Sequence, residues 1–253
     1  MELQGKIAVI TGGASGIGLA LAERFIKEGA TVVISDINEK ALNEKAAEIK
    51  ATPIPANVAI EEDVRNLVEK TTNRFGRIDI FVSNAGIAKF GGIESSKADW
   101  DFTMGVNLMS QIYAAKHVLP QMVERGSGYL VNTASAAGLL VEFHSVLYST
   151  SKHACIGLAE WLAATYSEAG VKVTVVCPGP VRTPMSVGVA AMQEDAIEPE
   201  ELVNQIIEAI EKEKFMVSSH EKIWKLYQTK AQDYDHYIDL LTQRRAYKLG
   251  LDK

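Results

Sequence analysis

Two residues in the stretch 145–152, Tyr148 and Lys152, have side chains that could together move a proton. They are four positions apart, and in a helix this spacing places both side chains on one face. A tyrosine hydroxyl ionises near pH ~10, and a neighbouring ammonium group favours its phenolate form. The spacing predicts an acid or base at Tyr148 that Lys152 supports. A surface contact would show the same spacing, so the surrounding elements have to decide between the two interpretations.

A glycine-rich turn lies between the first apolar run of the chain and the first helical pattern. Residues 6–11 suit a strand buried on both faces of a parallel sheet, and residues 19–29 have a helical pattern closed by a glycine. Glycines at such a turn let the backbone approach a pyrophosphate, whose charge the amides of the helix N-terminus would meet. An ordinary glycine turn is the alternative. The contacts expected here are Thr11, Gly12, Ser15, Gly16, Ile17 and Gly18.

Asp36 ends the next apolar run, residues 31–36, about 20 positions beyond the glycines, where dinucleotide-binding folds hold a carboxylate for the adenosine ribose. A carboxylate accepts from the ribose hydroxyls and repels a 2′-phosphate, so it favours NAD over NADP. Ser15 and Ile37 occupy the positions where a basic residue would have indicated NADP. The alternative role for Asp36 is to cap a helix over residues 39–50.

Strand and helix patterns continue to alternate along the chain. They predict strands at 53–58, 78–82, 129–133, 171–177 and 214–217, and helices at 60–75, 98–124, 199–213 and 219–241. This order is typical of an α/β fold with one doubly wound (Rossmann) parallel sheet, helices on both faces and a C-terminal helical tail. Because no linker-like segment divides the chain, we expect a single domain over residues 1–253. Its cofactor-binding half would cover about 1–110 and its catalytic and substrate half about 111–253.

Polar residues follow several of these strands at the edge where a ligand crevice is expected. Asn57 and Val58 follow the third strand, and Asn84, Ala85 and Gly86 follow the fourth. Asn84 could instead cap a turn.

Two further polar residues belong to the catalytic half or its border. Asn107 lies among apolar residues, so it must be hydrogen-bonded, either as a structural tie or as part of a polar relay. Ser135 precedes Tyr148 by thirteen residues.

Taken in order, these residues resemble the classical short-chain dehydrogenase/reductase family from Lys6 to about Met185. The resemblance rests on the glycine turn at 11–18, Asn-Ala-Gly at 84–86, a Tyr-x3-Lys pair and a Pro-Gly strand end at 178–179. Two positions depart from the family pattern: Asn57 replaces a usual Asp, and Ser83 replaces an Asn that commonly opens the Asn-Asn-Ala-Gly signature. Both departures concern cofactor packing more than the chemistry.

The resemblance also implies a role for each catalytic residue. Tyr148 would be the general acid in ketone reduction and the general base in alcohol oxidation, and Lys152 would assist it and hold the nicotinamide ribose. Ser135 would hydrogen-bond the substrate oxygen, and Asn107 would anchor a water that links Lys152 to solvent. Further cofactor contacts are implied at Asn57, Val58, Asn84, Ala85, Gly86, Pro178, Gly179, Val181 and Thr183.

The function implied is an NAD-dependent oxidoreductase that transfers a hydride between the nicotinamide and a secondary alcohol or ketone. The segment 136–144 is mostly apolar, and Met185, Val187 and Val189 follow the last motif, so an alkyl, aryl or alicyclic substrate is expected. Residues 186–196 are a candidate lid. The tail would pack on its own domain, cover the substrate mouth or join subunits of a homo-dimer or homo-tetramer.

Three alternatives compete with this interpretation. An enoyl reductase of related fold would space its Tyr and Lys differently, and a sugar-nucleotide epimerase would carry a longer C-terminal domain and another glycine spacing. The third alternative is an inactive regulatory or scaffold protein that binds NAD as a structural ligand. The presence of Ser135, Tyr148 and Lys152 together weighs against it.

The composition limits the remaining classes of partner. A net charge of −6, without a run of basic residues, argues against nucleic acid. No apolar segment approaches the ~20 residues that cross a bilayer, and no secretory signal is visible. Two cysteines and five histidines lack metal-site spacing, so no metal is expected and a reducing, cytoplasmic location is predicted.

Overall fold

Seven parallel strands form one continuous sheet in the order β3-β2-β1-β4-β5-β6-β7. In the computed structural model, residues 1–186 and 195–248 are described. The strands are β1 (Ile7–Thr11), β2 (Thr31–Ser35), β3 (Thr52–Pro53), β4 (Ile80–Ser83), β5 (Gly128–Thr133), β6 (Val171–Cys177) and β7 (Met216–Ser218). The chain starts in the interior of the sheet, builds outward through β2 and β3, and then returns to place β4 on the other side of β1. This order creates a switch point between β1 and β4, as expected for a doubly wound fold.

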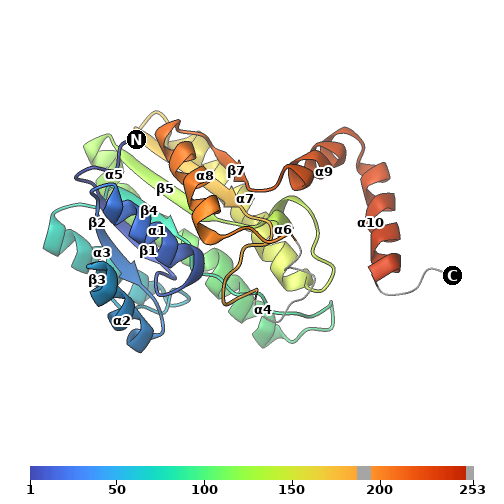
Figure 1. Cartoon of the computed structure of the whole chain (residues 1–253), viewed down its shortest axis with the longest axis horizontal. Helices are drawn as coiled ribbons and strands as arrows, with labels where there is room; N and C mark the ends of the chain where they lie inside the picture. Colours follow the sequence, from blue (N-terminus) through green and yellow to red (C-terminus); the bar gives the residue numbers. More distant parts are fainter. Residues whose placement is uncertain (187–194, 249–253) are drawn as a thin grey trace.

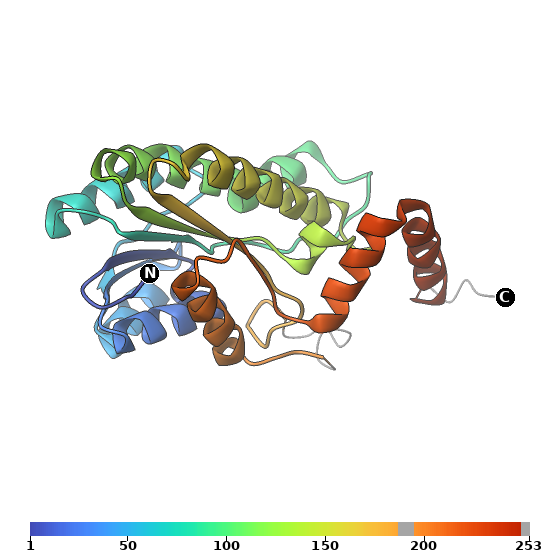
Figure 2. The same ribbon diagram turned by 90° about the horizontal axis from the view of Figure 1, so that it is seen from above.

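Helices cover both faces of the sheet, and Figure 2 shows the two layers edge-on. One layer contains α3 (Glu61–Phe75), α5 (Ser110–Arg125) and α7 (Val146–Tyr166). The other contains α1 (Gly16–Lys27), α2 (Glu39–Ile49) and α8 (Pro199–Glu211). The predicted single-domain α/β sheet with helices on both faces is therefore confirmed.

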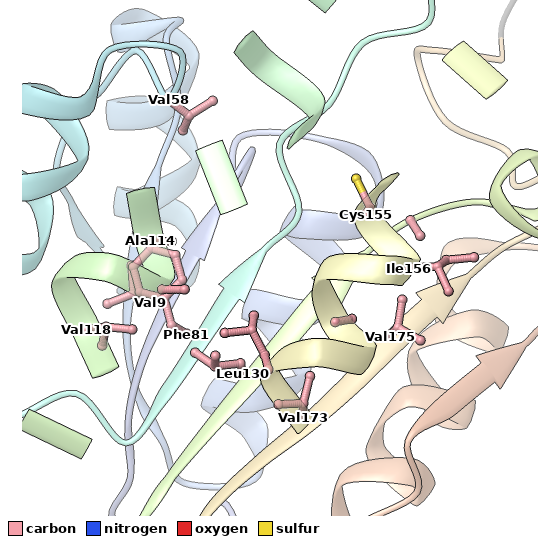
Figure 3. Close-up of a cluster of buried hydrophobic side chains, with 14 of the residues drawn as sticks. Val9, Val58, Phe81, Ala114, Val118, Leu130, Cys155, Ile156, Val173 and Val175 are labelled. Carbon is pink, nitrogen blue, oxygen red and sulfur yellow. The ribbon is translucent and has the colours of Figure 1, made fainter. Parts of the chain in front are cut away.

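Alternation along each strand divides the core between these two layers. Val9 and Phe81 pack in the cluster under α3, α5 and α7, whereas their neighbours Ile10 and Ile80 pack under α1, α2 and α8. Figure 3 shows Phe81 together with side chains from neighbouring strands and from α5 and α7. Because both faces are buried, the strands read as continuous apolar runs. The sheet thereby holds its carboxyl ends in fixed register for the site described below.

The long helix predicted at 98–124 is interrupted. It consists of α4 (Lys97–Met104), a π-helical turn at Gly105–Met109 and α5. The π turn contains Asn107, whose side chain bonds to a neighbouring loop and is fully buried. Such turns carry one extra residue within a helix and often occur at functional sites.

The single tail helix predicted at 219–241 is wrong, because two helices occupy this region. They are α9 (Glu221–Gln232) and α10 (Tyr234–Lys248), which extend away from the sheet in Figure 1. Asp233 separates them with an extended backbone, and its carboxylate accepts a hydrogen bond from the amide of His236. Asp233 therefore ends one helix and caps the next.

Smaller differences concern connecting segments. The third strand, predicted at 53–58, is confined to β3, and a short helix that the sequence pattern did not predict, α6 (Ala136–Leu139), follows Ser135. Most of the candidate lid at 186–196, with Val187 and Val189, lies outside the described residues. The helical geometry on which the pairing of Tyr148 with Lys152 depended is present, because both residues belong to the start of α7 (Val146–Tyr166).

Candidate active site

The glycine turn leads directly from β1 into α1. Gly12 and Gly16 have positive φ angles of 64° and 53°, which suit glycine. A Cβ on Gly18 would lie 2.1 Å from the carbonyl oxygen of Gly12, so the turn is too tight for any side chain there. The first turn of α1 holds no acidic residue, and the Ser15 side chain does not cap it. The N-terminus of α1 thus retains its positive end for an anion.

Other helices on the same sheet begin differently. Asn38 caps α2, and α3 starts with three acidic residues at positions 61–63. This contrast is evidence that a pyrophosphate group fits the turn before α1, since the amides there have no competing acceptor from their own first turn.

The carboxylate of Asp36 is directed back toward the glycine turn. Its Oδ2 atom accepts from the amide of Ala14 at 3.3 Å, and its Oδ1 atom accepts from the amide of Asn38 at 3.0 Å. The alternative role as a helix cap is wrong, because the side chain of Asn38 accepts from the Ala41 amide and caps α2. Asp36 is therefore held at the end of β2 beside the turn.

One cavity of about 360 Å³ runs along the carboxyl ends of the strands. Most predicted cofactor residues line it: Gly12, Ser15, Gly16, Ile17, Asp36, Ile37, Asn57, Val58, Asn84, Ala85, Gly86, Tyr148, Lys152, Pro178 and Thr183. The position agrees with the rule that ligands of doubly wound sheets bind at the switch point.

Tyr148 and Lys152 both reach this cavity from the first turns of α7. Ser145 caps the helix by accepting from the Tyr148 amide at 2.9 Å, which fixes where the helix begins. The Nζ atom of Lys152 lies 5.7 Å from the centre of the Tyr148 ring, so the two side chains share one face. Lys152 is only 2% exposed, and its ammonium donates to the carbonyl oxygen of Thr133 at 3.0 Å. This cation is buried against the end of β5, unlike a solvated surface lysine.

Asn107 joins the loop after β4 to α7. Its Nδ2 atom donates to the carbonyl oxygen of Ile87 at 3.0 Å and to Ser151 Oγ at 2.9 Å, while Oδ1 accepts from the Ile87 amide at 2.9 Å. A Cβ on Gly86 would lie 3.4 Å from both Asn107 Oδ1 and Lys152 Nζ, which shows how closely these groups surround the loop. Of the two roles considered, the side chain has that of a structural tie. Its proposed water anchoring stays a prediction.

Ser135 lies two residues beyond the end of β5, and its Oγ atom accepts from the Ala137 amide at 3.1 Å. It thereby caps α6. The side chain is nearly buried and does not line the cavity, whereas its neighbours Thr133 and Ala134 do. The role of Ser135 toward a substrate oxygen stays a prediction.

Four other predicted contacts also lie behind the cavity wall. Thr11 accepts from the amides of Asn84 and Ala85, so it shapes the wall indirectly. The remaining three are Gly18, Gly179 and Val181, which do not line the cavity.

The sequence reasoning missed several lining residues: Ala56, Ile87, Phe102, Val106, Thr133, Ala134 and Pro184. Thr133 and Ala134 could have been found, since they stand at the carboxyl end of β5 where the crevice rule already pointed. Phe102 and Val106 could not have been found from the sequence, because α4 and the π turn approach the crevice through tertiary packing.

Both cysteines are buried beside this site. Burial raises the pKa of the Cys177 thiol to about 12, and it also raises the pKa of Cys155. The Cys155 thiol donates to the carbonyl oxygen of Asn107 at 3.1 Å. Both groups therefore stay neutral thiols at physiological pH. Among the residues that the structure describes, no three His, Cys, Asp or Glu side chains gather as a metal site would require.

In the described part of the chain, none of the helices combines the length and the apolar character that a bilayer crossing needs.

Comparisons with known proteins agree with this geometry. The family model for short chain dehydrogenases matches residues 6–194. An uncharacterized oxidoreductase of Thermotoga maritima is 39% identical over 214 residues, which cover 83% of this chain and 84% of the relative. A protein named 3beta-hydroxysteroid dehydrogenase 2, from Eggerthella lenta, is 36% identical over 194 residues, or 74% of this chain and 75% of the relative.

A solved structure gives the same result. The crystal structure of a short chain dehydrogenase/reductase from Burkholderia phymatum in complex with NAD superposes with a TM-score of 0.86 at 28% identity, covering 93% of this chain and 96% of that one. With its glycine turn, its Tyr148 and buried Lys152 on one helix face and a family match over most of its length, the chain belongs to the short chain dehydrogenase family of oxidoreductases.

Proposed function

We propose that this protein is an NAD-dependent oxidoreductase that interconverts an apolar secondary alcohol and its ketone. The observation that carries the proposal is that Tyr148 and the buried Lys152 open into the same cavity as Asp36 and the glycine turn. A proton-transferring pair and a dinucleotide cradle thus share one crevice. An inactive NAD-binding scaffold would have no need of such an arrangement.

NAD is favoured over NADP by the charge at the ribose end of the cavity. Two backbone amides hold the Asp36 carboxylate in place, and a 2′-phosphate there would meet a fixed negative charge. Among the described residues that line the cavity, Lys152 is the one Lys or Arg, and it belongs to the catalytic end. The NAD complex of the Burkholderia phymatum relative supports the same cofactor.

The nicotinamide would supply the hydride for ketone reduction or accept it from an alcohol. Tyr148 would hold the proton at its hydroxyl and exchange it with the substrate oxygen. Lys152 would assist the tyrosine from the next helical turn, and its bond to the carbonyl oxygen of Thr133 holds its amino group against the end of β5. Ser135 would orient the substrate oxygen by donating its hydroxyl hydrogen, while its own oxygen accepts from the Ala137 amide.

An apolar substrate is supported by the loops after β4, β5 and β6. Each exposes a large apolar side chain, namely Phe90, Val141 and Met185. The first two loops are joined by a bridge between Gly91 and Ser145 and by an edge-on contact of Phe90 with the His144 ring. The 3beta-hydroxysteroid dehydrogenase relative, whose name denotes an alicyclic secondary alcohol, agrees with this class. The candidate substrates are therefore alkyl, aryl or alicyclic.

A panel of secondary alcohols with NAD and with NADP, followed through NADH absorbance, tests the proposal. We expect the highest kcat/KM for an alicyclic or aryl alcohol with NAD. A higher kcat/KM for a polyol, or a strong preference for NADP, would contradict the substrate or the cofactor assignment respectively.

The Tyr148→Phe variant tests the catalytic assignment. We expect kcat to fall roughly 10²- to 10⁴-fold, the usual contribution of a positioned acid or base, while NADH binding measured by fluorescence is unchanged. Tyr113→Phe, in α5, serves as a matched control because Tyr113 does not line the cavity. If wild type turns over no alcohol yet binds NADH, the inactive scaffold is the correct interpretation.

Three broader expectations accompany this function. They are a cytoplasmic location, assembly into a homo-dimer or homo-tetramer, and the division into a cofactor-binding half at 1–110 and a catalytic half at 111–253. Light scattering of the purified protein at several concentrations measures the oligomeric state directly.

A further inference from the structure

A chain of three hydrogen bonds connects the two described ends of the segment between β6 and α8. The amide of Gly179 lies 2.9 Å from Ser219 Oγ, Ser219 Oγ lies 2.6 Å from His220 Nδ1, and His220 Nε2 lies 2.9 Å from the carbonyl oxygen of Asp195. Ser219 and His220 form the turn between β7 and α9. None of these residues was part of the site described above except Gly179.

The chemistry of the two ends fixes the direction of every bond in this chain. The Asp195 carbonyl oxygen can only accept, so His220 Nε2 carries a hydrogen, and in the neutral ring Nδ1 is then the acceptor. Ser219 must therefore donate its hydroxyl hydrogen to His220, and its oxygen accepts from the Gly179 amide. Burial lowers the pKa of His220, which agrees with a neutral ring. All three bonds point from Gly179 toward Asp195.

The end at Gly179 is close-packed. A Cβ on Gly179 would lie 2.5 Å from His220 Nδ1 and 2.6 Å from Ile223 Cδ1, so the backbone approaches the imidazole without room for a side chain. The other end has an additional ion pair between Lys222 and the Asp195 carboxylate. Both of its side chains are more than half exposed, so this pair contributes little.

The segment 178–185, which contains Gly179, forms one wall of the cavity. Pro178, Thr183 and Met185 line it, and Thr183 packs against the glycine turn, where a Cβ on Gly16 would lie 3.2 Å from it. A shift of Gly179 would therefore reach the cofactor cradle through Thr183.

We propose that Ser219 and His220 are positioning residues, which hold the cavity wall 178–185 against the glycine turn without touching cofactor or substrate. This proposal rests on the function proposed above, because the wall is assigned to a cofactor crevice. It adds two residues from the C-terminal side of the fold, beyond the region matched by the family model, to the machinery of the site.

Kinetics of variants test the positioning role. In Ser219→Ala and His220→Ala we expect KM for NAD to rise roughly two- to tenfold, as for one lost neutral hydrogen bond, while kcat changes less because Tyr148 and Lys152 are untouched. His220→Asn keeps an acceptor at the level of Nδ1 and should restore most of the affinity. Ser218→Ala is the matched control, since its buried hydroxyl has no hydrogen-bond partner among the described residues.

A double variant tests whether the two residues act as one unit. If they do, Ser219→Ala combined with His220→Ala should raise KM no further than the stronger single variant. Effects that multiply would show two independent contacts and overturn the proposal. Equal KM values for Ser219→Ala and the Ser218→Ala control would overturn it as well.

Hydrogen exchange gives a readout that does not depend on activity. Pro178 and Pro180 carry no amide hydrogen, so Gly179 contributes a single isolated amide between them. Its exchange should accelerate in Ser219→Ala and stay slow in Ser218→Ala, with melting temperatures of the two variants alike. Unchanged exchange of the Gly179 amide would refute the chain of hydrogen bonds itself. If the wild type proved inactive with NAD, the proposed function would fail while this measurement still decided the hydrogen-bond chain.

Discussion

The carboxylate of Asp36 is oriented by the backbone amides of Ala14 and Asn38, which leaves it little freedom to turn away from a ligand. A charge fixed in this way discriminates against a second negative charge more effectively than a mobile side chain would. The preference for NAD is thus tied to one residue, and it can be tested there.

Asp36→Ala should lower kcat/KM for NAD roughly 10- to 100-fold, since a hydrogen bond to a charged group contributes about 1.5–3 kcal/mol. The ratio of NADP to NAD activity should rise at the same time, because the repulsion is removed. Steady-state kinetics with both cofactors measure both effects. Asp101→Ala removes the same charge from an exposed position in α4 and should change neither. A fall in activity without a change in cofactor ratio would count against this role for Asp36.

Asn107 has a structural importance that can be separated from catalysis. Asn107→Ala should lower the free energy of unfolding by about 2–4 kcal/mol, because both backbone groups of Ile87 and the Ser151 hydroxyl lose a buried partner. Urea unfolding measures the change. Ser151→Ala removes one of the three hydrogen bonds of the Asn107 side chain and should lower the free energy of unfolding by clearly less. Equal losses in the two variants would show that the bonds to Ile87 contribute nothing.

At the level of elements, the ammonium group of Lys230 in α9 contacts both α6 and α7. Lys230 of α9 donates to the carbonyl oxygen of Leu139 at 2.7 Å and lies 3.3 Å from His153 Nε2. His153 Nδ1 must carry a hydrogen, because it lies 2.8 Å from the carbonyl oxygen of Ser149. Nε2 is then the acceptor, so the contact requires a neutral histidine. Burial, and then the charge of Lys230, lower the pKa of His153 below its ordinary value of 6.5.

This contact should make the stability of the protein depend on pH. The unfolded chain binds a proton near the ordinary pKa of 6.5, whereas the folded chain resists it. The contribution of neutral His153 to the free energy of unfolding is therefore fully present above pH 6.5. It is lost as the pH falls from there toward the lowered pKa of His153 in the folded state. Urea unfolding at about pH 7.5 and about pH 5.5 measures the loss. His153→Gln cannot titrate and should lose less stability over this interval; an equal loss would exclude His153 as the source.

Regular elements were predictable because their signals are local. The strands β1, β2 and β6 and the helix α3 follow from apolar runs and spacing that a few neighbouring residues define. The π turn at Asn107 was not, because its partners Ile87 and Ser151 are distant in sequence. The break at Asp233 did have a local signal, since an Asp before a helical pattern is a common cap, but regular apolar spacing across it concealed that signal.

The site was also predictable only where its signals are local in the sequence. Residues at strand ends such as Asp36 and Asn84 follow from the crevice rule alone. The chain of hydrogen bonds from Gly179 through Ser219 to Asp195 could not be predicted from the sequence, because its members come together only when β7 pairs with β6. Whether Ser135 contacts a substrate depends on a bound ligand, which no sequence pattern contains.

In the molecule as a whole, α10 is attached at few points. Tyr237 is 1% exposed and Leu241 is 9% exposed, whereas most of α10 is open to solvent. The crevice, by contrast, is built from strand ends and from α1, α4 and α7. Helix α10 and the cofactor site are thus structurally separate.

Removal of residues 234–253 should therefore reduce stability without changing NADH affinity. We expect a loss of about 2–4 kcal/mol, since the apolar surface that Tyr237 covers would be exposed. Thermal unfolding and NADH fluorescence titration measure the two quantities, and light scattering shows whether assembly depends on α10. A weaker NADH affinity in the shortened chain would indicate that the tail supports the crevice after all.

The position of β1 inside the sheet has a consequence for how the protein is made. Ala8 pairs with Ile80, and the glycine turn finds its partner Thr183 only after β6 has been synthesised. At about 5–20 residues per second, a ribosome needs on the order of ten to thirty seconds to extend the chain from Ala8 to Thr183. Throughout that interval the nascent chain carries apolar strands with unpaired edges, and its cofactor cavity lacks the wall at 178–185. Protection by chaperones during synthesis, and by ligand only after release, is the expected order of events.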